Sequence, residues 1–177
     1  MASKPEESES SYDLCIMRHG IAADRGNGMG GGDAERPLTV EGKERMEEIA
    51  KGLARIGFAP QWVVSSSYVR AAETARIVAA SLSPEVPLDY CKALEPGGAP
   101  EALLAFLARN SERRTVLVVG HEPDLSQLAA RLMGAGRHAN FVFKKGGCCL
   151  ISFDEFPPAA PGRLAWWLTP RILRKLT

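Results

Sequence analysis

The sequence predicts an α/β protein, with a three-layer α/β/α sandwich built on a mostly parallel sheet. Short apolar runs such as 14–17 and 116–119 end at a polar residue or a glycine, as buried parallel strands often do. Stretches with apolar residues at helical spacing alternate with these runs, which is typical of a parallel sheet covered by helices. The 177 residues suit one domain, residues 12–177. It follows a polar, acidic tail, residues 1–11, that we expect to be disordered.

The first half of the chain is expected to hold two strands and two helices. An apolar run predicts a strand at about 12–17. A helix with apolar residues on one face then runs from Thr39, a suitable N-cap, to just before Gly57. Residues 61–64 form a second apolar run, and the alanine-rich stretch 68–82 predicts the second helix.

The second half repeats this alternation and then ends in paired strands. We expect a short strand at 87–90 and a helix at 100–109, with an acidic residue in the first turn as the helix dipole favours. A strand at 115–119 precedes a helix at 124–133. Two late strands, expected to pair with each other, and a basic tail close the chain, at 148–153, 163–168 and 171–175.

Composition excludes several classes of protein. The formal net charge of +1 indicates no nucleic-acid or membrane partner, and no apolar stretch approaches the roughly 20 residues of a membrane span. The chain starts without an apolar signal-peptide core, so we expect a cytoplasmic protein. Its four cysteines include no C-x-x-C, and the adjacent Cys148 and Cys149 should face opposite sides of a strand, so we interpret them as buried thiols.

Two histidines follow two of the predicted strands. Arg18-His19-Gly20 comes after the first strand, and His121 follows the strand that ends at Gly120. Ligands of open α/β sheets bind beyond the carboxyl ends of the strands, so both histidines should face one crevice. Imidazole can attack phosphorus, and the guanidinium of Arg18 matches phosphate geometry. The pattern indicates phosphoryl chemistry with a histidine nucleophile.

A second arginine is expected at the same edge. Arg70 falls in the first turn of the helix at 68–82, where free N–H groups and the helix dipole attract anions. The alternative is a solvated surface arginine. A metal centre is not expected, because the chain has three histidines, one of which, His138, lies in a polar loop, and no ligand spacing of a metalloenzyme is present.

The glycine-rich segment 25–36 contains a misleading pattern. Gly26, Gly28 and Gly31 match the G-x-G-x-x-G of dinucleotide-binding proteins. That motif must follow a strand directly and open a helix, whereas here it lies eight residues beyond the strand and Pro37 separates it from the next helix. We therefore expect no cofactor, and interpret the segment as a mobile loop at the border of the site.

Three motifs together resemble the histidine phosphatase superfamily, the phosphoglycerate mutase-like proteins. They are the R-H-G at residues 18–20, an S-x-x-x-R-A-x-x-T element at 66–74, and the G-H at 120–121. Within the superfamily the chain is similar to the short SixA-type phosphohistidine phosphatases. The supporting segments are 36–42, 119–126, 144–147 and 166–170, so the resemblance spans nearly the whole chain.

The resemblance implies roles for particular residues. His19 would attack phosphorus, while Arg18, Arg70 and His121 would hold the phosphoryl oxygens, without a metal. His19 must then present an unprotonated nitrogen, so we expect a backbone carbonyl to hold its other N–H. Arg36 is a lesser candidate for substrate binding, the alternative being a salt bridge within its loop.

One feature departs from larger members of the superfamily. They carry an acidic proton donor in an insertion after the S-x-x-x-R-A helix, whereas here that region is short and Glu95 is its nearest carboxylate. A phosphoramidate substrate needs a donor less, because its leaving imidazole can depart protonated.

The leading hypothesis is a phosphatase that removes the phosphoryl group from phosphohistidine in a protein, such as a histidine-phosphotransfer domain. A phosphatase of small phosphorylated metabolites would use the same residues. An inactive module that only binds phosphorylated partners is the alternative from another class. We expect a monomer. The sequence leaves the roles of Lys144 and Lys145 open.

Overall fold

The computed structural model describes residues 11–24, 32–136 and 139–177. The predicted N-terminal tail apart from Ser11, the first part of the glycine-rich segment (25–31) and His138 lie outside the described residues. Six strands and five α-helices, with two short 3-10 helices, follow one another along the described chain. They are β1 (Tyr12–Arg18), η1 (Asp33–Glu35), α1 (Val40–Arg55), β2 (Trp62–Ser65), α2 (Val69–Leu82), β3 (Leu88–Tyr90), η2 (Lys92–Leu94), α3 (Pro100–Ala108), β4 (Thr115–Gly120), α4 (Asp124–Leu132), β5 (Cys148–Phe153), β6 (Arg163–Leu168) and α5 (Pro170–Leu173).

All six strands form one sheet in the order β3-β2-β4-β1-β5-β6. The pairs β3·β2, β2·β4 and β4·β1 are parallel, whereas β5 runs antiparallel to both β1 and β6. The sheet is thus mostly parallel, as predicted, and the late strands pair with each other. The carboxyl ends of β1, β2 and β4 lie at one edge of the sheet, where each strand passes into a loop.

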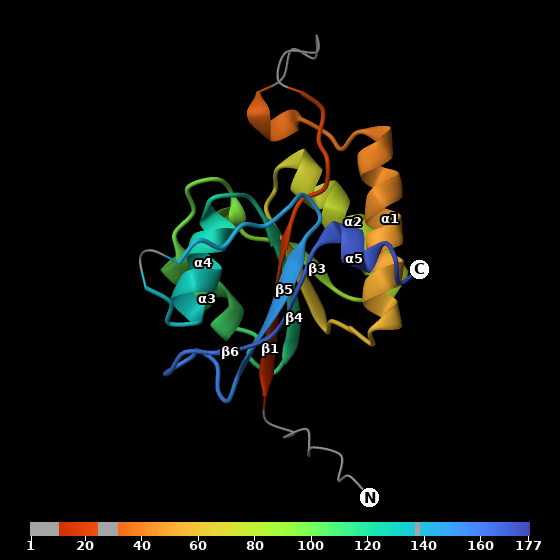
Figure 1. Cartoon of the computed structure of the whole chain (residues 1–177). Coiled ribbons are helices and arrows are strands. Elements are labelled where there is room, and N and C mark those ends of the chain that lie inside the picture. Colours follow the sequence, from red (N-terminus) through yellow and green to blue (C-terminus); the bar gives the residue numbers. More distant parts are fainter. Residues whose placement is uncertain (1–10, 25–31, 137–138) are drawn as a thin grey trace, which may run out of the picture.

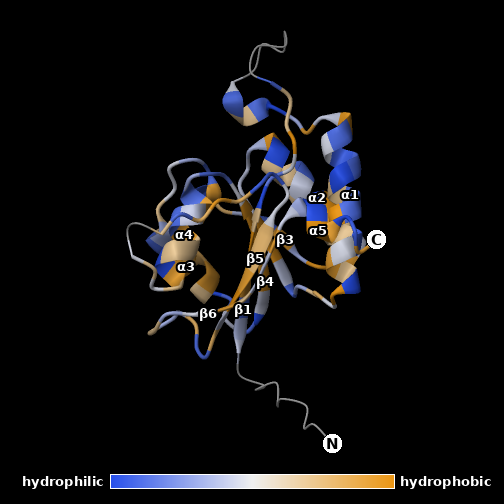
Figure 2. Cartoon of the chain, in the orientation of Figure 1, coloured by the Kyte–Doolittle hydropathy of each residue, from blue (hydrophilic) through white to orange (hydrophobic). Residues whose placement is uncertain are grey.

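Helices cover both faces of the sheet. Figure 1 shows α1, α2 and α5 on one face and α3 and α4 on the other, which confirms the three-layer α/β/α architecture. The strands between them are largely hydrophobic, while α1 is mostly hydrophilic on its outer side (Figure 2). Because successive strand residues point to opposite faces, β1 contributes to both cores: Leu14 and Ile16 pack towards α3 and α4, and Cys15 and Met17 towards α1 and α2.

Most predicted boundaries agree with the structure to within a residue or two. Thr39 caps α1, and its hydroxyl accepts a hydrogen bond from the N–H of Gly42. Cys148 and Cys149 are buried, unbridged and on opposite faces of β5. The expected basic tail differs, because part of it forms the short helix α5, whose Leu173 is fully buried against α1. No helix in the described part of the chain has the length and apolarity to cross a membrane.

Candidate active site

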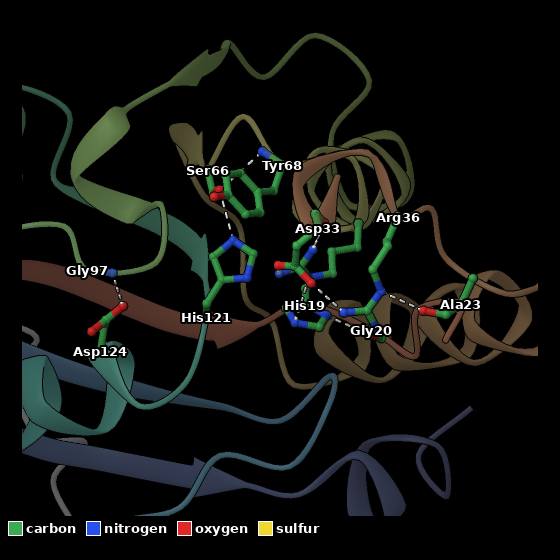
Figure 3. A network of polar contacts seen from close by, with 11 residues as sticks. His19, Gly20, Ala23, Asp33, Arg36, Ser66, Tyr68, Gly97, His121 and Asp124 are labelled. Atoms are coloured by element: carbon green, nitrogen blue, oxygen red, sulfur yellow. Dashed lines mark hydrogen bonds and ion pairs between the residues drawn. The ribbon is translucent and has the colours of Figure 1, made fainter. Parts of the chain in front are cut away.

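The two histidines predicted at the strand ends lie side by side. Arg18, the last residue of β1, pairs in register with Gly120, the last residue of β4, so His19 and His121 leave the sheet together. Their ring centroids are 5.1 Å apart, and both side chains are buried (Figure 3). The parallel pairing of β1 with β4 therefore brings together two residues that are about a hundred positions apart in the sequence.

His19 is held in one tautomer. Its Nδ1–H donates to the carbonyl oxygen of Gly20 over 2.7 Å, so Nε2 carries the lone pair. Burial lowers the pKa of His19 to about 3; the Gly20 contact opposes that shift, and the charge of Arg70 adds to it. At neutral pH the ring is uncharged, and Nε2 can act as a nucleophile. A backbone carbonyl does hold the other nitrogen, as expected from the sequence.

Arg70 is buried rather than solvated. It lies in the first turn of α2, is 5% exposed, and its Nε–H donates to Nε2 of His19 over 3.3 Å. Its two terminal nitrogens donate to Asp33, Nη1 to the backbone carbonyl at 2.6 Å and Nη2 to the carboxylate at 2.9 Å. The guanidinium also lies 5.1 Å from the ring centre of Tyr68. Arg70 thus points into the site from the start of its helix.

Arg18 is anchored by the loop that precedes β5. Its Nη1 donates to the carbonyl of Phe143 at 2.8 Å, and the N–H of Phe143 donates in turn to Glu122. Burial lowers the pKa of Arg18, and the charge of Glu122 opposes that shift. The buried Nε of Arg18 has no hydrogen-bond partner among residues 11–24, 32–136 and 139–177. It is a donor that a bound anion can satisfy.

His121 contacts a serine hydroxyl through one of its two ring nitrogens. Its Nε2 lies 2.9 Å from Oγ of Ser66, which follows β2. Burial, and then the charge of Arg70, lower the pKa of His121 to about 4, while Asp33 opposes that shift. Its Nδ1 is buried and lacks a partner within the described part of the chain. His121 is therefore a second uncharged histidine with one unsatisfied nitrogen.

Two further segments hold the backbone of the R-H-G motif. The N–H of Gly146 donates to the carbonyls of Arg18 and His19, at 3.0 and 3.1 Å. Gly146 has a φ of +80°, and a Cβ there would lie 2.7 Å from Ile49, so this position favours glycine. On the other side, the hydroxyl of Thr74 accepts from the N–H of Gly20 and donates to the carbonyl of Arg70.

The remaining candidates lie around this group. Arg36 donates from Nε to the carbonyl of Ala23 and from Nη1 to Asp33, both at 2.7 Å, so it reaches Arg70 only through Asp33. This is the salt bridge within its loop that the sequence left open. Glu95 accepts a hydrogen bond from Ser67 at 2.6 Å. Lys144 and Lys145 are exposed.

Sequence reasoning missed Asp33, which contacts both Arg70 and Arg36. It also missed the contacts of Ser66 and Thr74, although both belong to a motif that was recognised; their spacing was the available signal. No group of three or more histidine, cysteine or acidic side chains suited to a metal occurs in the described residues. The charge available for binding an anion comes from the two arginines.

The chain is similar in sequence to known proteins. The sequence model of the histidine phosphatase superfamily (branch 1) matches residues 14–95. An uncharacterized protein from Picosynechococcus sp. is 36% identical over 139 residues, covering 76% of this chain and 81% of that protein.

Solved structures share the fold. The protein histidine phosphatase SixA complexed with tungstate superposes with a TM-score of 0.77 at 26% identity, covering 91% of this chain and 99% of that one. A mycobacterial glucosyl-3-phosphoglycerate phosphatase has a TM-score of 0.70 at 17% identity, covering 90% and 99% of the two chains. This second likeness shows the fold alone.

Proposed function

The chain belongs to the histidine phosphatase superfamily, and we propose that it removes the phosphoryl group from phosphohistidine in a protein, through a phosphohistidine formed on its own His19. One observation carries the proposal. Nε2 of His19 is unprotonated, faces the guanidinium of Arg70 and is fixed by the contact of Nδ1 with Gly20. A buried neutral imidazole beside a cation is suited to attack a bound phosphoryl group.

The first step transfers the phosphoryl group to His19. As Nε2 forms a bond to phosphorus, the bond from phosphorus to the leaving group breaks and its electron pair departs with that group. The arginines hold the equatorial oxygens and stabilise their negative charge, as preorganised cations do in phosphoryl transfer. The carbonyl of Gly20 stabilises the positive charge that develops on the His19 ring, because it accepts the Nδ1–H.

The second step returns His19 to its starting state. A water oxygen bonds to phosphorus, the bond from Nε2 to phosphorus breaks, and its electron pair returns to Nε2. The water proton leaves to solvent, and inorganic phosphate is released. The two steps together consume the phosphorylated substrate and one water, and the protein is regenerated.

Two observations support a phosphoramidate substrate. The chain is 26% identical to SixA, which is described as a protein histidine phosphatase. Only β3 and the 3-10 turn η2 lie between α2 and α3, so no inserted helix adds a proton donor there. A leaving imidazole can carry its own proton, so it depends on a donor less than an alkoxide does.

A phosphatase of small metabolites is the second candidate. The fold is shared with the mycobacterial glucosyl-3-phosphoglycerate phosphatase and with an alpha-ribazole phosphatase from Shigella flexneri, which has a TM-score of 0.67 at 21% identity. The same four residues, Arg18, His19, Arg70 and His121, would serve either substrate. A fold common to several substrates leaves the choice to groups outside this set.

A substrate panel separates these possibilities. Phosphate release is measured from a phosphohistidine peptide, a phosphorylated histidine-phosphotransfer domain and a set of phosphorylated sugars and nucleosides, with His19→Ala as the control. We expect the highest kcat/KM on the phosphohistidine substrates and no turnover by the variant. A higher kcat/KM on a metabolite would contradict the proposal, and tight binding without turnover of any substrate would identify a binding module.

A further inference from the structure

Ser66 has two hydrogen-bond contacts in the site, one with a backbone nitrogen and one with a ring nitrogen of His121. Its Oγ lies 3.2 Å from the backbone nitrogen of Tyr68 and 2.9 Å from Nε2 of His121. A backbone N–H can only donate, so the hydroxyl oxygen accepts from Tyr68. The hydroxyl proton remains to be placed, and Nε2 of His121 is the one acceptor that the described residues offer it at hydrogen-bond distance.

We infer that Ser66 is a positioning residue: its hydroxyl donates to Nε2 of His121 and thereby fixes the tautomer in which Nδ1 carries the proton. The inference about the tautomer concerns the free protein. Its use, donation of the Nδ1–H to a phosphoryl oxygen, rests on the proposed function. Figure 3 shows Ser66 at one ring nitrogen of His121, with the other nitrogen on the side of His19.

The unsatisfied nitrogen supports this assignment. Nδ1 of His121 is buried and finds no partner in the part of the chain that the structure describes. When Nδ1 carries the proton, it is a hydrogen-bond donor without an acceptor in the free protein. The anion that the arginines attract supplies that acceptor. In the opposite tautomer Nδ1 would turn a lone pair towards that anion, and the hydroxyl proton of Ser66 would lose its acceptor at Nε2.

The two histidines then have the same tautomer and opposite functions. In His19 the Nδ1–H is occupied by the carbonyl of Gly20, and the bare Nε2 faces the reacting phosphorus. In His121 the unprotonated Nε2 accepts from the hydroxyl of Ser66, and the Nδ1–H faces the site. Neighbouring hydrogen bonds, rather than charge, thus make one ring a nucleophile and the other a donor. The edge-to-face contact of Tyr68 with the ring, at 5.2 Å, helps to hold its orientation.

Nitrogen-15 NMR of the imidazole rings tests the tautomer directly. The chain has three histidines, so substitution of His19 and of His138 by asparagine assigns the signals. In the free wild-type protein at pH 7 we expect His121 to show a protonated Nδ1 and an unprotonated Nε2. Ser66→Ala should lose this preference and show protonation at Nε2. A wild-type His121 protonated at Nε2 overturns the inference, and so does a Ser66→Ala protein that keeps the proton on Nδ1.

Kinetics test whether the tautomer serves the reaction. Ser66→Ala should lower kcat for phosphohistidine hydrolysis about tenfold, with a smaller effect on KM, because an oriented donor to the transition state is lost. Ser66→Thr keeps a hydroxyl and should restore both the NMR signature and most of kcat. Ser81→Ala removes an exposed hydroxyl from α2 and should change neither.

The NMR and kinetic measurements test the tautomer of His121 and the proposed function independently. NMR reports on the folded protein even if the variant is less stable, and it needs no substrate. If the wild-type protein has no phosphohistidine activity but shows the expected tautomer, the proposed function fails and the positioning role of Ser66 stands. Full kcat in a Ser66→Ala protein with an altered tautomer would overturn the role in catalysis.

Discussion

Asp33 and Arg70 form an ion pair within the candidate site. The carboxylate lies 2.9 Å from Nη2 of Arg70, and the backbone carbonyl of the same aspartate lies 2.6 Å from Nη1. A phosphoryl group held by Arg70 has to share these nitrogens with a negatively charged side chain. The second carboxylate oxygen of Asp33 is bonded to Arg36. The free site therefore already contains an anionic group of its own.

Removing the charge of Asp33 should strengthen anion binding. Asp33→Asn removes the charge repulsion and weakens the competition for Nη2 of Arg70, because a neutral amide oxygen is a weaker acceptor than a carboxylate. We therefore expect the Kd for tungstate, measured by calorimetry, to fall roughly fivefold, the equivalent of about 1 kcal/mol. Glu35→Gln, an exposed neighbour in the same 3-10 turn, is the control and should leave the Kd unchanged. Unchanged or weaker binding by Asp33→Asn would show that this carboxylate does not compete with the ligand.

Arg70→Ala should lower kcat/KM by about 10²–10³-fold, because one preorganised cation beside the reacting phosphorus is lost. Arg70→Lys should recover only part of the rate, since an ammonium lacks the planar fork of donors. The matched control is Arg76→Ala, an exposed arginine on the same helix whose Nη2 contacts the hydroxyl of Tyr90. Steady-state kinetics that show full activity for Arg70→Ala would exclude Arg70 from catalysis.

Stability should fall as the pH drops below neutrality. Burial lowers the pKa values of His19 and His121 to about 3 and about 4. In the unfolded chain both groups titrate near pH 6.5, so below that pH the unfolded state binds more protons and the free energy of unfolding decreases. This stability is complete above about pH 6.5 and is lost as the pH falls towards the two folded-state values.

Between pH 7.5 and pH 5 the expected loss is about 1–2 kcal/mol for each histidine. Urea unfolding at several pH values measures it, with a His19→Gln/His121→Gln double variant for comparison. The variant should show a much flatter dependence. Equal slopes for the two proteins would mean that these histidines are not buried in their neutral form.

Catalysis should survive removal of divalent metal ions. The two arginines supply the positive charge at the site, and the described residues contain no cluster of three metal-binding side chains. Turnover measured after dialysis against EDTA should equal that of the untreated enzyme. Activity that disappears with EDTA and returns with added Mg²⁺ or Zn²⁺ would refute metal independence.

The sequence predicted the strand-end residues because their positions depend on simple rules. His19 and His121 follow short apolar runs that are typical of buried strands, and parallel strands place their carboxyl ends at one edge. Arg70 was predicted from its place in the first turn of a helix. Periodicity and turn residues also located each of the longer helices and strands, whose apolar faces are long enough to be unambiguous.

The features that were not predicted depend on information that the local sequence does not contain. Asp33 follows a run of glycines without any periodicity, and its contact with Arg70 joins residues 37 positions apart. The depth of Arg70 could not be predicted, because a helical arginine is ordinarily solvated. Ser66 belonged to a recognised motif, but the role that we propose for it depends on the direction of one hydroxyl proton. Helix α5 has only four residues, too few for a helical pattern.

The site of phosphorylation tests the account most directly. The enzyme is mixed with a substrate labelled in its phosphoryl group, quenched within milliseconds and digested, and the label is mapped by mass spectrometry. We predict a phosphoenzyme that is labile in acid and stable in base, with the label on His19 and none in His19→Ala. Label on a serine, cysteine or aspartate, or turnover by the His19→Ala protein, would contradict a mechanism through this histidine.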